Sequence, residues 1–469
     1  MPPTLALYLT LGFIAFLFWR DARGRPEGTS ALWLPFFWVI VGSGSRFLSQ
    51  WLDIFGIHTG GITVEDGSPI DAAFYLLLIL AGIRVLHQRR INFATFFRNN
   101  HWVAIYFAYC LLSVLWSDFP YVASKRWIKL FGDPVMALVI LTEPEPLESF
   151  ALLMKRCAYV MLPVSILFIK YFPWLGRGFD DWTGVAHNTG IATNKNELGF
   201  DCWILGSALF WHLLQVWNRA PGKARRSELV LCVGLLGMDV WLLHEAQSAT
   251  SLVALVLGAA IMLGVNFRWV NVKRIGVYIC AGVIGCVLAG AAFGLFGDVI
   301  HLLGRNETFT GRTDIWRMLW NWKINPVIGT GFESFWLGER REEIQSQLSF
   351  LNEAHNGYLE TYLNLGYVGV GLTMALLLAT YAKARRSLLA NFEWGRFRLA
   401  FLFAFIVYNW TEAAFRLNAF PFFMFFIIAI DYPARQFAAE EQITDLAEAG
   451  SGTEPGYISA GWPIAVNER

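Results

Sequence analysis

Charged residues are scarce in this chain of 469 residues. Asp, Glu, Lys and Arg together make up 16% of it, whereas soluble domains carry roughly a quarter. The two signs nearly cancel, with 37 basic and 36 acidic side chains and a net charge of +1, so the composition gives no reason to expect binding to nucleic acid. Hydrophobic residues account for 56% of the chain. This balance is typical of an integral membrane protein.

Cysteine is also rare, and its positions exclude two kinds of site. All 6 cysteines fall in apolar stretches, none lies in a predicted outer loop and none forms a CxxC pair. We therefore expect neither a disulfide framework nor a cysteine metal site. The predicted outer loops also contain no Asp-x-Asp pair and no His/Cys cluster at ligand spacing. We expect a function that needs no metal ion and no other cofactor.

Apolar stretches close to the roughly 20 residues that a helix needs to cross a bilayer recur along most of the chain. The predicted spans are 4–19, 32–50, 70–86, 101–116, 127–142, 157–172, 198–217, 229–246, 249–265, 275–296, 358–381, 399–413 and 418–431. No basic leader precedes the first span, and basic residues follow it, so we expect no cleavable signal peptide.

Basic residues are concentrated in alternate linkers between these spans. By the positive-inside rule, the basic linkers face the cytoplasm, and they are 20–25, 87–90, 219–226, 268–274 and 383–386. The outward-facing linkers are then 51–69, 117–126, 173–197, 297–357 and 413–417. Thirteen spans place the N-terminus outside and the C-terminus inside. Twelve spans are the alternative, because the first span and the hairpin 229–265 are the least distinct.

The predicted fold is therefore an all-α polytopic membrane domain over residues 1–433. One long outer loop, 297–357, separates the tenth and eleventh spans. The remaining residues, 434–469, are rich in Gly, Pro and Ala and turn acidic, which is typical of a flexible tail, here on the cytoplasmic side.

The long outer loop contains three local patterns. Residues 310–322 predict a short amphipathic helix, with Trp316 and Trp320 on its apolar face at the membrane interface. Asn325-Pro326 ends this helix because proline lacks an amide donor, and a glycine turn follows. Beyond the turn, Asn356, Glu360 and Asn364 recur every fourth residue, which predicts one polar stripe entering the membrane.

Charge near lipid is costly and is usually functional. Arg312, His355 and Glu360 occur together in the one long outer loop, so we predict a functional site there. The structural alternative is helix capping and polar contacts between spans.

The shorter outer loops add polar residues at the same surface. They are Arg126, Arg177, Lys195, Glu412 and Arg416. Each of them, considered alone, fits an interfacial anchor or an ion pair, since long basic side chains extend to the lipid headgroups.

Three blocks of sequence resemble the O-antigen ligase and Wzy-type polymerase family. The most specific block is Gly311-Arg312, Trp316, Asn325-Pro326, Gly329, Gly331, His355-Asn356, Tyr358-Leu359-Glu360, Asn364, Gly366 and Gly369. The second runs from Ser113 to Pro120 and includes Arg126, and the third is 193–199. The third block is similar to the exopolysaccharide-producing, ExoQ-like branch of the family. With the span pattern, the resemblance extends over about residues 70–430.

The resemblance implies a GT-C-like fold, an active site facing the periplasm and no requirement for metal. By position, the family's histidine falls on His355 and its arginine on Arg312. A second arginine of many ligases is absent from the run 247–251. The resemblance therefore leaves a second contact to pyrophosphate to Arg126, Lys195 or Arg177.

These patterns together predict a metal-independent, inverting polysaccharide polymerase of the bacterial inner membrane. We expect Arg312 to bind the pyrophosphate of a polyprenyl-linked glycan donor, since a guanidinium contacts phosphate with two donors. We expect His355 to activate the acceptor hydroxyl, with Glu360 or Asn356 orienting its ring. Trp316 and Tyr358 are expected to contact the substrate.

The expected partners are this donor, a lipid-linked glycan acceptor, the bilayer, and chain-length regulators or export proteins. The alternative function is an O-antigen ligase that uses lipid A–core as its acceptor. A transporter of lipid-linked sugars is a further alternative, but its polar groups should lie at mid-membrane in paired broken helices.

Overall fold

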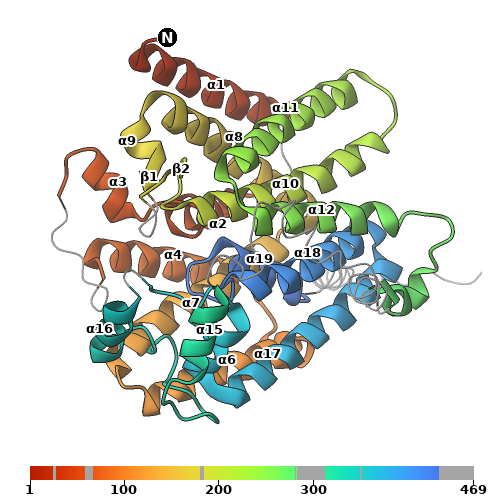
Figure 1. Cartoon of the computed structure of the whole chain (residues 1–469). Coiled ribbons are helices and arrows are strands. Elements are labelled where there is room, and N and C mark those ends of the chain that lie inside the picture. The colour runs from red at the N-terminus through yellow and green to blue at the C-terminus, as the bar shows by residue number, and fades with distance from the viewer. Residues whose placement is uncertain are drawn as a thin grey trace, which may run out of the picture. The chain divides into compact units, whose positions relative to one another are not determined.

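The computed structural model of the chain describes residues 1–24, 28–58, 67–179, 184–279, 281–282, 312–348 and 351–432. Residues Met1–Tyr432 form one compact unit, which is built almost entirely of helices (Figure 1). The predicted tail, 434–469, and the first part of the long loop, 297–311, lie outside the described residues.

The elements of the first half are α1 (Pro3–Arg23), η1 (Ser30–Leu32), α2 (Trp33–Trp38), η2 (Val39–Ser43), α3 (Leu48–Ile54), α4 (Pro69–Gln88), α5 (Phe93–Asn99), α6 (His101–Leu112), η3 (Ser113–Trp116), α7 (Pro120–Leu141), α8 (Pro146–Tyr171), α9 (Pro173–Gly176), β1 (Arg177–Phe179), β2 (Ala186–Asn188) and α10 (Lys195–Trp217). Those of the second half are α11 (Lys223–Ala246), α12 (Ala249–Gly264), η4 (Val272–Arg274), α15 (Arg312–Trp320), α16 (Gly338–Gln347), α17 (Gly357–Ala390), α18 (Phe392–Thr411) and α19 (Phe420–Ala429). The strands β1 and β2 form one antiparallel hairpin.

Every predicted span except 275–296 coincides with helical residues, which confirms the all-α polytopic fold. Among the described residues, 5 helices are long and apolar enough to cross a membrane, judged by length and composition, or 6 if one bent pair counts as a span. The other helices at predicted spans are shorter or more polar. Most of 275–296 lies outside the described residues, so the choice between twelve and thirteen spans stays a prediction.

The second predicted span, 32–50, is bent and not one straight helix. The helical stretch Ser30–Ser43 ends at a break, and Leu48–Ile54 continues at an angle of 69°. Gly42 has φ +144° inside the break, and a side chain there would overlap Tyr75. Glycine tolerates this backbone because it has no Cβ. The hydrophobic pattern continued through the break, so the sequence pattern did not reveal it.

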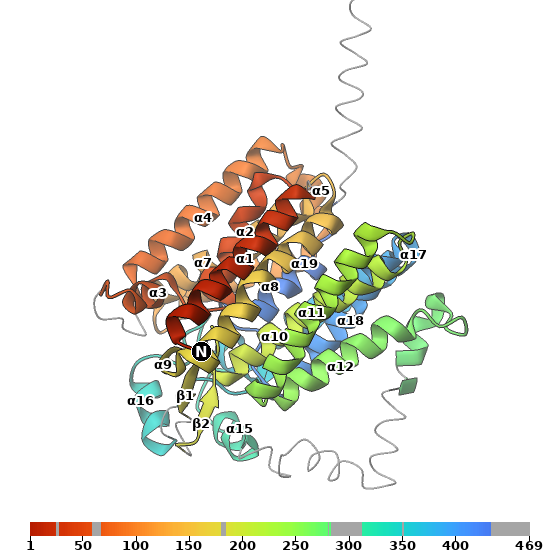
Figure 2. The same ribbon diagram turned by 90° about the horizontal axis from the view of Figure 1, so that it is seen from above.

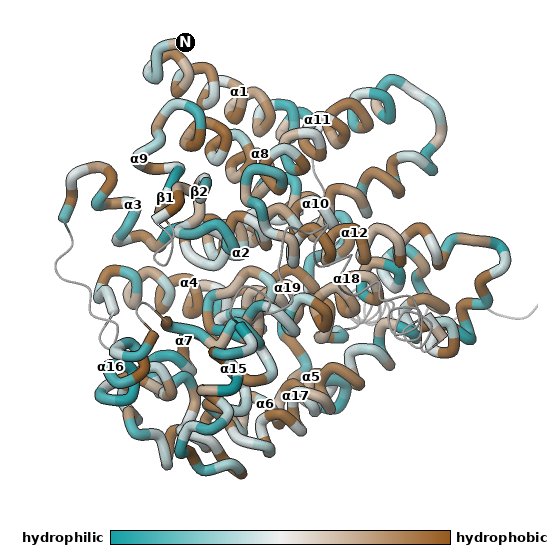
Figure 3. Tube along the Cα trace, viewed as in Figure 1, coloured by the Kyte–Doolittle hydropathy of each residue, from teal (hydrophilic) through white to brown (hydrophobic). Residues whose placement is uncertain are grey.

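The predicted outer loops contact one another at one end of the unit. The hydroxyl oxygens of Ser117 and Ser334 lie 2.6 Å apart. The amide of Leu417 donates to Glu333 over 3.2 Å. Figure 2 shows α9, the β-hairpin, α15 and α16 gathered at the same end. Hydrophilic residues are concentrated along α15 and α16, whereas the long helices are largely hydrophobic (Figure 3).

The helices beneath this end are packed through aromatic side chains. The indole of Trp203 on α10 stacks on Phe401 and Tyr408 of α18, with ring centroids 5.0 and 4.9 Å apart. All residues of α19 are buried. Offset stacking of buried rings adds to the free energy of apolar burial. This packing fixes the end of α18, from which the last outer loop emerges.

The glycine turn of the long loop crosses a kink in α17. Gly366 has φ +64° and ψ −166° within this helix, and a Cβ there would overlap the backbone of Val327. The kink exposes helix carbonyls, and the turn satisfies two of them. The amides of Thr330 and Gly331 donate to Leu363 and Asn364 over 3.2 and 2.9 Å. The amides of Thr330 and Gly331 are therefore already hydrogen-bonded to α17.

We predict that Gly366→Ala destabilises the protein by about 3 kcal/mol, because the backbone conformation at Gly366 is one that essentially only glycine adopts. The measurement is thermal unfolding of the purified protein in detergent. Gly371→Ala is the matched control, since Gly371 lies on the same helix and an added Cβ there meets nothing within 4 Å. Equal melting temperatures for the two variants would contradict the role of the kink.

Candidate active site

The long outer loop has a small hydrophobic core of its own. It is formed by Leu319, Phe335, Ile344, Leu351, Ala354, Leu359, Tyr362 and Leu363. The apolar face predicted for α15 packs against this core, and the side chain of Trp316 on that face contacts the core residues. Its indole donates to the carbonyl of Ala354 over 2.9 Å. This hydrogen bond and the core hold the backbone just before His355.

Glu360 fixes the same segment from the opposite side. Its carboxylate accepts from the indole of Trp336 at 2.6 Å and from the amide of Ala354 at 2.9 Å. The side chain of Asn364 donates to it over 3.1 Å, as the predicted polar stripe required. Glu360 therefore positions the loop by accepting a hydrogen bond from the backbone amide of Ala354. The expectation that it orients the ring of His355 is not met.

Asn356 is the N-cap of α17. Its side-chain oxygen accepts from the amides of Tyr358 and Leu359, each over 3.0 Å, which satisfies two free donors of the helix start. Its amide group donates to Trp410 over 3.1 Å. Asn356 thus joins α17 to the end of α18, and the expectation that it orients the ring of His355 is not met either.

The ring of His355 faces two carboxylates. Its Nδ1 lies 2.9 Å from Glu353 and 3.5 Å from Glu412. His355 has φ +47°, the left-handed conformation. Residues other than glycine adopt it rarely, and such backbone often occurs at functional sites. The turn at His355 is what brings a residue of the long loop against Glu412, at the end of α18.

Arg312 contacts the same carboxylate from the first turn of α15. Its guanidinium lies 2.6 Å from Glu412 and also donates to the carbonyl of Thr411. Arg312 is buried, with 8% of its surface exposed. A role as an anchor to lipid headgroups therefore does not fit this side chain. Two acceptors, the carboxylate of Glu412 and the carbonyl of Thr411, hold it inside the protein. A planar guanidinium can donate to both at once, whereas an ammonium group does so less well.

Arg416 completes the arrangement from the last outer loop. It forms an ion pair with Glu353 and lies 3.9 Å from Glu197. We call Arg312, Glu353, His355, Glu412 and Arg416 the charged cluster. At the first turn of α10, Asn196 donates to Glu412 over 3.4 Å, so this helix also reaches the cluster.

The charges of the cluster hold one another in their ionised forms. Burial lowers the pKa of His355, but Glu353 and Glu412 raise it further, to about 10. Burial raises the pKa of Glu353, but Arg416 and His355 together bring it well below its usual value. Glu353 also raises the pKa of Arg416. At neutral pH, His355 is therefore an imidazolium without a lone pair to accept a proton.

The other predicted site residues lie at different distances from the cluster. Arg126 donates to the carbonyl of Glu333, in the turn that contacts the last outer loop. Lys195 begins α10, next to Asn196. Arg177 lies on β1, within the hairpin. Its guanidinium donates to the carbonyl of Ile169 over 3.1 Å. The hydroxyl of Tyr358 donates to Ile406 over 3.0 Å, between α17 and α18.

The main partners of His355 were not predicted from the sequence. Glu353 lies two residues before His355, and this closeness was the signal that could have identified it. Glu412 and Arg416, considered alone, fitted an interfacial anchor or an ion pair. They are far from His355 in the sequence, and the signal for them was that they lie in an outer loop at the same membrane face.

Two groups of side chains in the described residues have metal-ligand spacing. One is Glu353, His355 and Glu412, whose ligand atoms lie within 4.8 Å of one another. Both carboxylates are already paired with guanidinium groups. A divalent cation would have to displace these pairs, so the arrangement fits an ion-pair network better than a metal site. That catalysis needs no metal stays a prediction.

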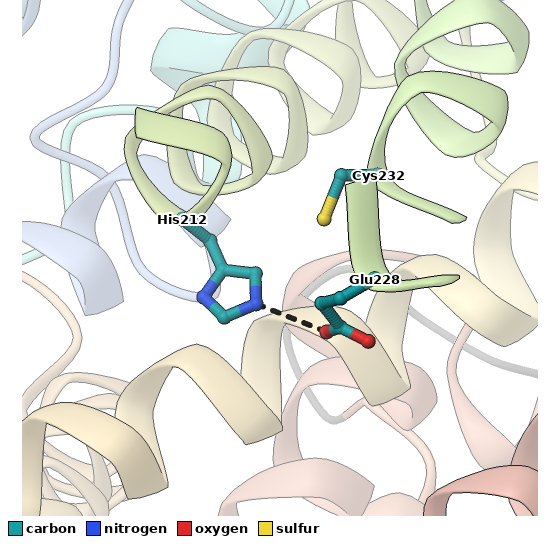
Figure 4. Close-up of side chains that lie close together, drawn as sticks. All are labelled: His212, Glu228 and Cys232. Carbon is teal, nitrogen blue, oxygen red and sulfur yellow. Dashed lines mark hydrogen bonds and ion pairs between the residues drawn. The ribbon is translucent and has the colours of Figure 1, made fainter. Parts of the chain in front are cut away.

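The second group is His212, Glu228 and Cys232 (Figure 4). His212 lies 3.1 Å from Glu228, which also binds Lys155 and Arg20, each at 2.7 Å. Two fixed cations on the carboxylate oppose binding of a metal ion. His212 lies sixteen residues beyond Asn196 on α10, about 24 Å along the helix. This ion-pair network ties predicted cytoplasmic linkers together at the other end of the unit.

Residues 233–374 match the family model described as O-antigen ligase. No curated protein matches the chain. The matched range begins in α11 and ends in α17, and it contains Arg312, Glu353 and His355. This match agrees with the helical membrane fold. Residues 233–374 of the chain are therefore similar to the O-antigen ligase family.

Proposed function

We propose that this protein is a polysaccharide polymerase of the bacterial inner membrane. It transfers a growing glycan from polyprenyl pyrophosphate to a hydroxyl of the next lipid-linked repeat unit. The reaction takes place at the periplasmic face, needs no metal ion and inverts the anomeric carbon. The single observation that carries this proposal is an apolar groove that ends at the charged cluster.

The apolar groove lies between α12, α17 and α18 and has a cavity volume of about 1080 Å³. Val253, Leu378 and Tyr381 are among the residues that line it. Its polar end is formed by Asn356 and Thr411. A prenyl chain lying in this groove would place its headgroup beside Thr411, whose carbonyl already binds Arg312.

The charges at this end suit a pyrophosphate. Arg312 is permanently charged and presents several donors to phosphate oxygens. Its carboxylate partner, Glu412, holds it in place while no donor is bound. A pyrophosphate carries enough negative charge to compete for the same donors. Stabilising the leaving group in this way replaces the divalent cation that other glycosyltransferases use.

His355 fits this reaction best as a third cation. Its two carboxylate neighbours keep the ring protonated, as the pKa of about 10 indicates. An imidazolium beside Arg312 and Arg416 adds positive charge where the leaving group gains negative charge. The general-base role predicted from sequence requires a neutral ring, and the two neighbouring carboxylates disfavour that form by raising the pKa of His355.

The position of the cluster argues against a transporter. Transporters bind substrate near the bilayer midplane, at broken helices of paired repeats. Here the charged cluster lies in loops and at helix ends, on the side where the predicted outer loops meet. Positioned cations and a lipid groove are what transfer from a lipid-linked donor requires.

We predict that Val253→Trp raises the KM for the lipid-linked donor about tenfold. A bulky indole would displace part of the prenyl chain, and losing the burial of two methylene groups costs about 1.6 kcal/mol. The assay uses purified protein in nanodiscs with lipid-linked repeat units extracted from a deletion strain, and the product length is read on a gel. Val256→Trp is the control, since Val256 is exposed on the same helix and outside the groove lining.

In the same assay, wild-type protein should extend the glycan on its lipid carrier. Lipid A–core is offered in parallel as the competing acceptor. Transfer to lipid A–core alone would identify a ligase and overturn the polymerase. An unchanged donor KM in Val253→Trp would remove the apolar groove from the site.

We predict that Arg312→Lys lowers turnover at least about tenfold, because a lysine cannot make both contacts of the guanidinium. Turnover and donor binding are measured in matched nanodisc samples. Arg317→Lys is the control, since Arg317 lies on the same helix and is exposed beside Asp314. If Arg312→Lys has wild-type activity, Arg312 has no specific role in catalysis.

We predict that His355→Ala lowers turnover by roughly 10²–10³-fold, as expected for loss of one positioned group that stabilises the leaving-group charge, with the protein still inserted and folded. In the wild type, the rate should fall as the pH rises through about 10, where the ring of His355 loses its proton. The measurement is the pH–rate profile at saturating substrate, compared with that of His355→Ala. A rate that instead rises across this range would restore the base role.

A further inference from the structure

A second cavity lies against the charged cluster, and the function proposed above assigns no role to it. Its volume is about 140 Å³, far smaller than that of the apolar groove. Three regions line it: the break in the second span at 42–47, the start of α10, and the chain from Tyr408 to Pro421. Glu353 also contributes to the lining. We call it the polar cavity.

The break in the second span provides one side of the polar cavity. Ser43 and Ser45 use their hydroxyl groups to satisfy the carbonyls of Trp38 and Ile40. Irregular backbone at membrane depth is tolerated only where it is buried in protein or lines a water-filled cavity. Such a break would be unfavourable in an ordinary membrane span. Here it is tolerated because the broken segment lines the polar cavity.

The charges around the polar cavity select against an anion. Glu197, Glu353 and Glu412 line it together with a single guanidinium, that of Arg416. A pyrophosphate would meet more negative than positive charge there. A neutral molecule with many hydroxyl groups would not, because hydroxyls donate to carboxylates and accept from Asn196 and Arg416. A sugar residue has this chemistry.

The lining also contains apolar surface of the kind that sugars contact. The aromatic rings of Phe47, Phe200 and Tyr408 all contribute to it. A pyranose ring has an apolar face of C–H groups that packs against such rings. The small volume leaves room for a sugar residue and not for a prenyl chain, which fits the apolar groove instead.

Glu412 separates the polar cavity from the donor end of the apolar groove. One of its oxygens lies 2.6 Å from Arg312, on the side of Thr411. The other oxygen accepts from Asn196, in the lining of the polar cavity, over 3.4 Å. A hydroxyl in the polar cavity would thus approach the reacting sugar from a side different from that of the leaving pyrophosphate. An inverting displacement requires this arrangement.

We propose that the polar cavity binds the acceptor sugar and that Glu353 is the catalytic base that takes the proton from its attacking hydroxyl. The proposal rests on the proposed transfer function and adds the acceptor site to it. Glu353 contacts His355 through one oxygen and Arg416 through the other. Each oxygen of a carboxylate has two lone pairs, so one on each oxygen is still available.

In the transfer step, the acceptor oxygen forms a bond to the anomeric carbon of the donor sugar. The bond between this carbon and the phosphate oxygen breaks, and its electron pair leaves with the pyrophosphate. The acceptor hydroxyl becomes strongly acidic as its oxygen bonds to the anomeric carbon. It then loses its proton to the carboxylate of Glu353, although the neighbouring cations keep the pKa of this carboxylate low. A carboxylate performs the same task in inverting glycoside hydrolases, where the other reactant is water.

The binding part of the proposal is tested with Asn196→Leu. This variant loses an amide that lines the polar cavity and partly fills it, so the acceptor KM should rise at least about tenfold. The donor KM should stay within about twofold of the wild type. The acceptor is the lipid-linked repeat unit from the deletion strain, and the donor, whose concentration is varied separately, is glycan polymer preformed on the same lipid. Asn218→Leu is the control, because Asn218 is exposed at the opposite end of α10.

A second measurement uses the unaltered protein, in case Asn196→Leu does not fold. Repeat-unit sugar released from its lipid by mild acid should inhibit the wild type competitively against the acceptor and not against the donor. Competition against the donor, or a rise in donor KM in Asn196→Leu, would overturn the assignment of the polar cavity.

The base is tested with Glu353→Gln and azide. The variant should lose 10²–10⁴-fold in transfer to the sugar acceptor. Azide is a nucleophile that carries no proton to remove, so it should restore cleavage of the donor and give a glycosyl azide, detected by mass spectrometry. A purely structural role of Glu353 would leave azide without effect, and that result would remove the base assignment.

Failure of the proposed function is distinguishable from failure of this inference. A wild-type protein that transfers no glycan from any lipid-linked donor would overturn the function itself. An active wild type whose acceptor KM is unchanged in Asn196→Leu would leave the function standing and overturn the acceptor site alone.

Discussion

The carboxylate of Glu412 is the interaction on which the site depends. It is buried at the end of α18 and contacts Arg312, His355 and Asn196, which come from three different segments of the chain. A buried carboxylate without partners would be strongly destabilising. Folding therefore has to bring these segments together, and in doing so it assembles the charged cluster.

The membrane imposes a second constraint, which concerns the backbone. Hydrogen-bonding groups of a broken helix must be satisfied inside the protein. The breaks at Gly366 and at 42–47 in the described helices are satisfied differently. At Gly366 the glycine turn of the long loop supplies amides to the freed carbonyls. At 42–47 serine hydroxyls do so, beside the polar cavity. Both breaks lie next to segments that form the site, so backbone irregularity and proposed function coincide.

The proposed function also explains why the charges are paired in the absence of substrate. Unpaired cations beside lipid would be costly, and carboxylates cancel them until an anion arrives. Glu353 and Glu412 thus hold Arg416 and Arg312 in position, and they keep His355 protonated. One set of side chains then provides both the stability of the empty site and the charge for the leaving group. The same carboxylates border the polar cavity, where a neutral acceptor fits.

The sequence by itself determined the class of protein, the helical character of most predicted spans and the loop that carries Arg312 and His355. These follow from hydropathy and local spacing, which are properties of neighbouring residues. Only the tertiary structure decided that Glu353, Glu412 and Arg416 meet His355, because their approach depends on a left-handed turn and on the packing of α18. It also decided the protonation of His355, since that depends on carboxylates brought near by folding. The breaks at 42–47 and Gly366 escaped the sequence analysis for a related reason: hydrophobicity continues through a bend that other segments stabilise.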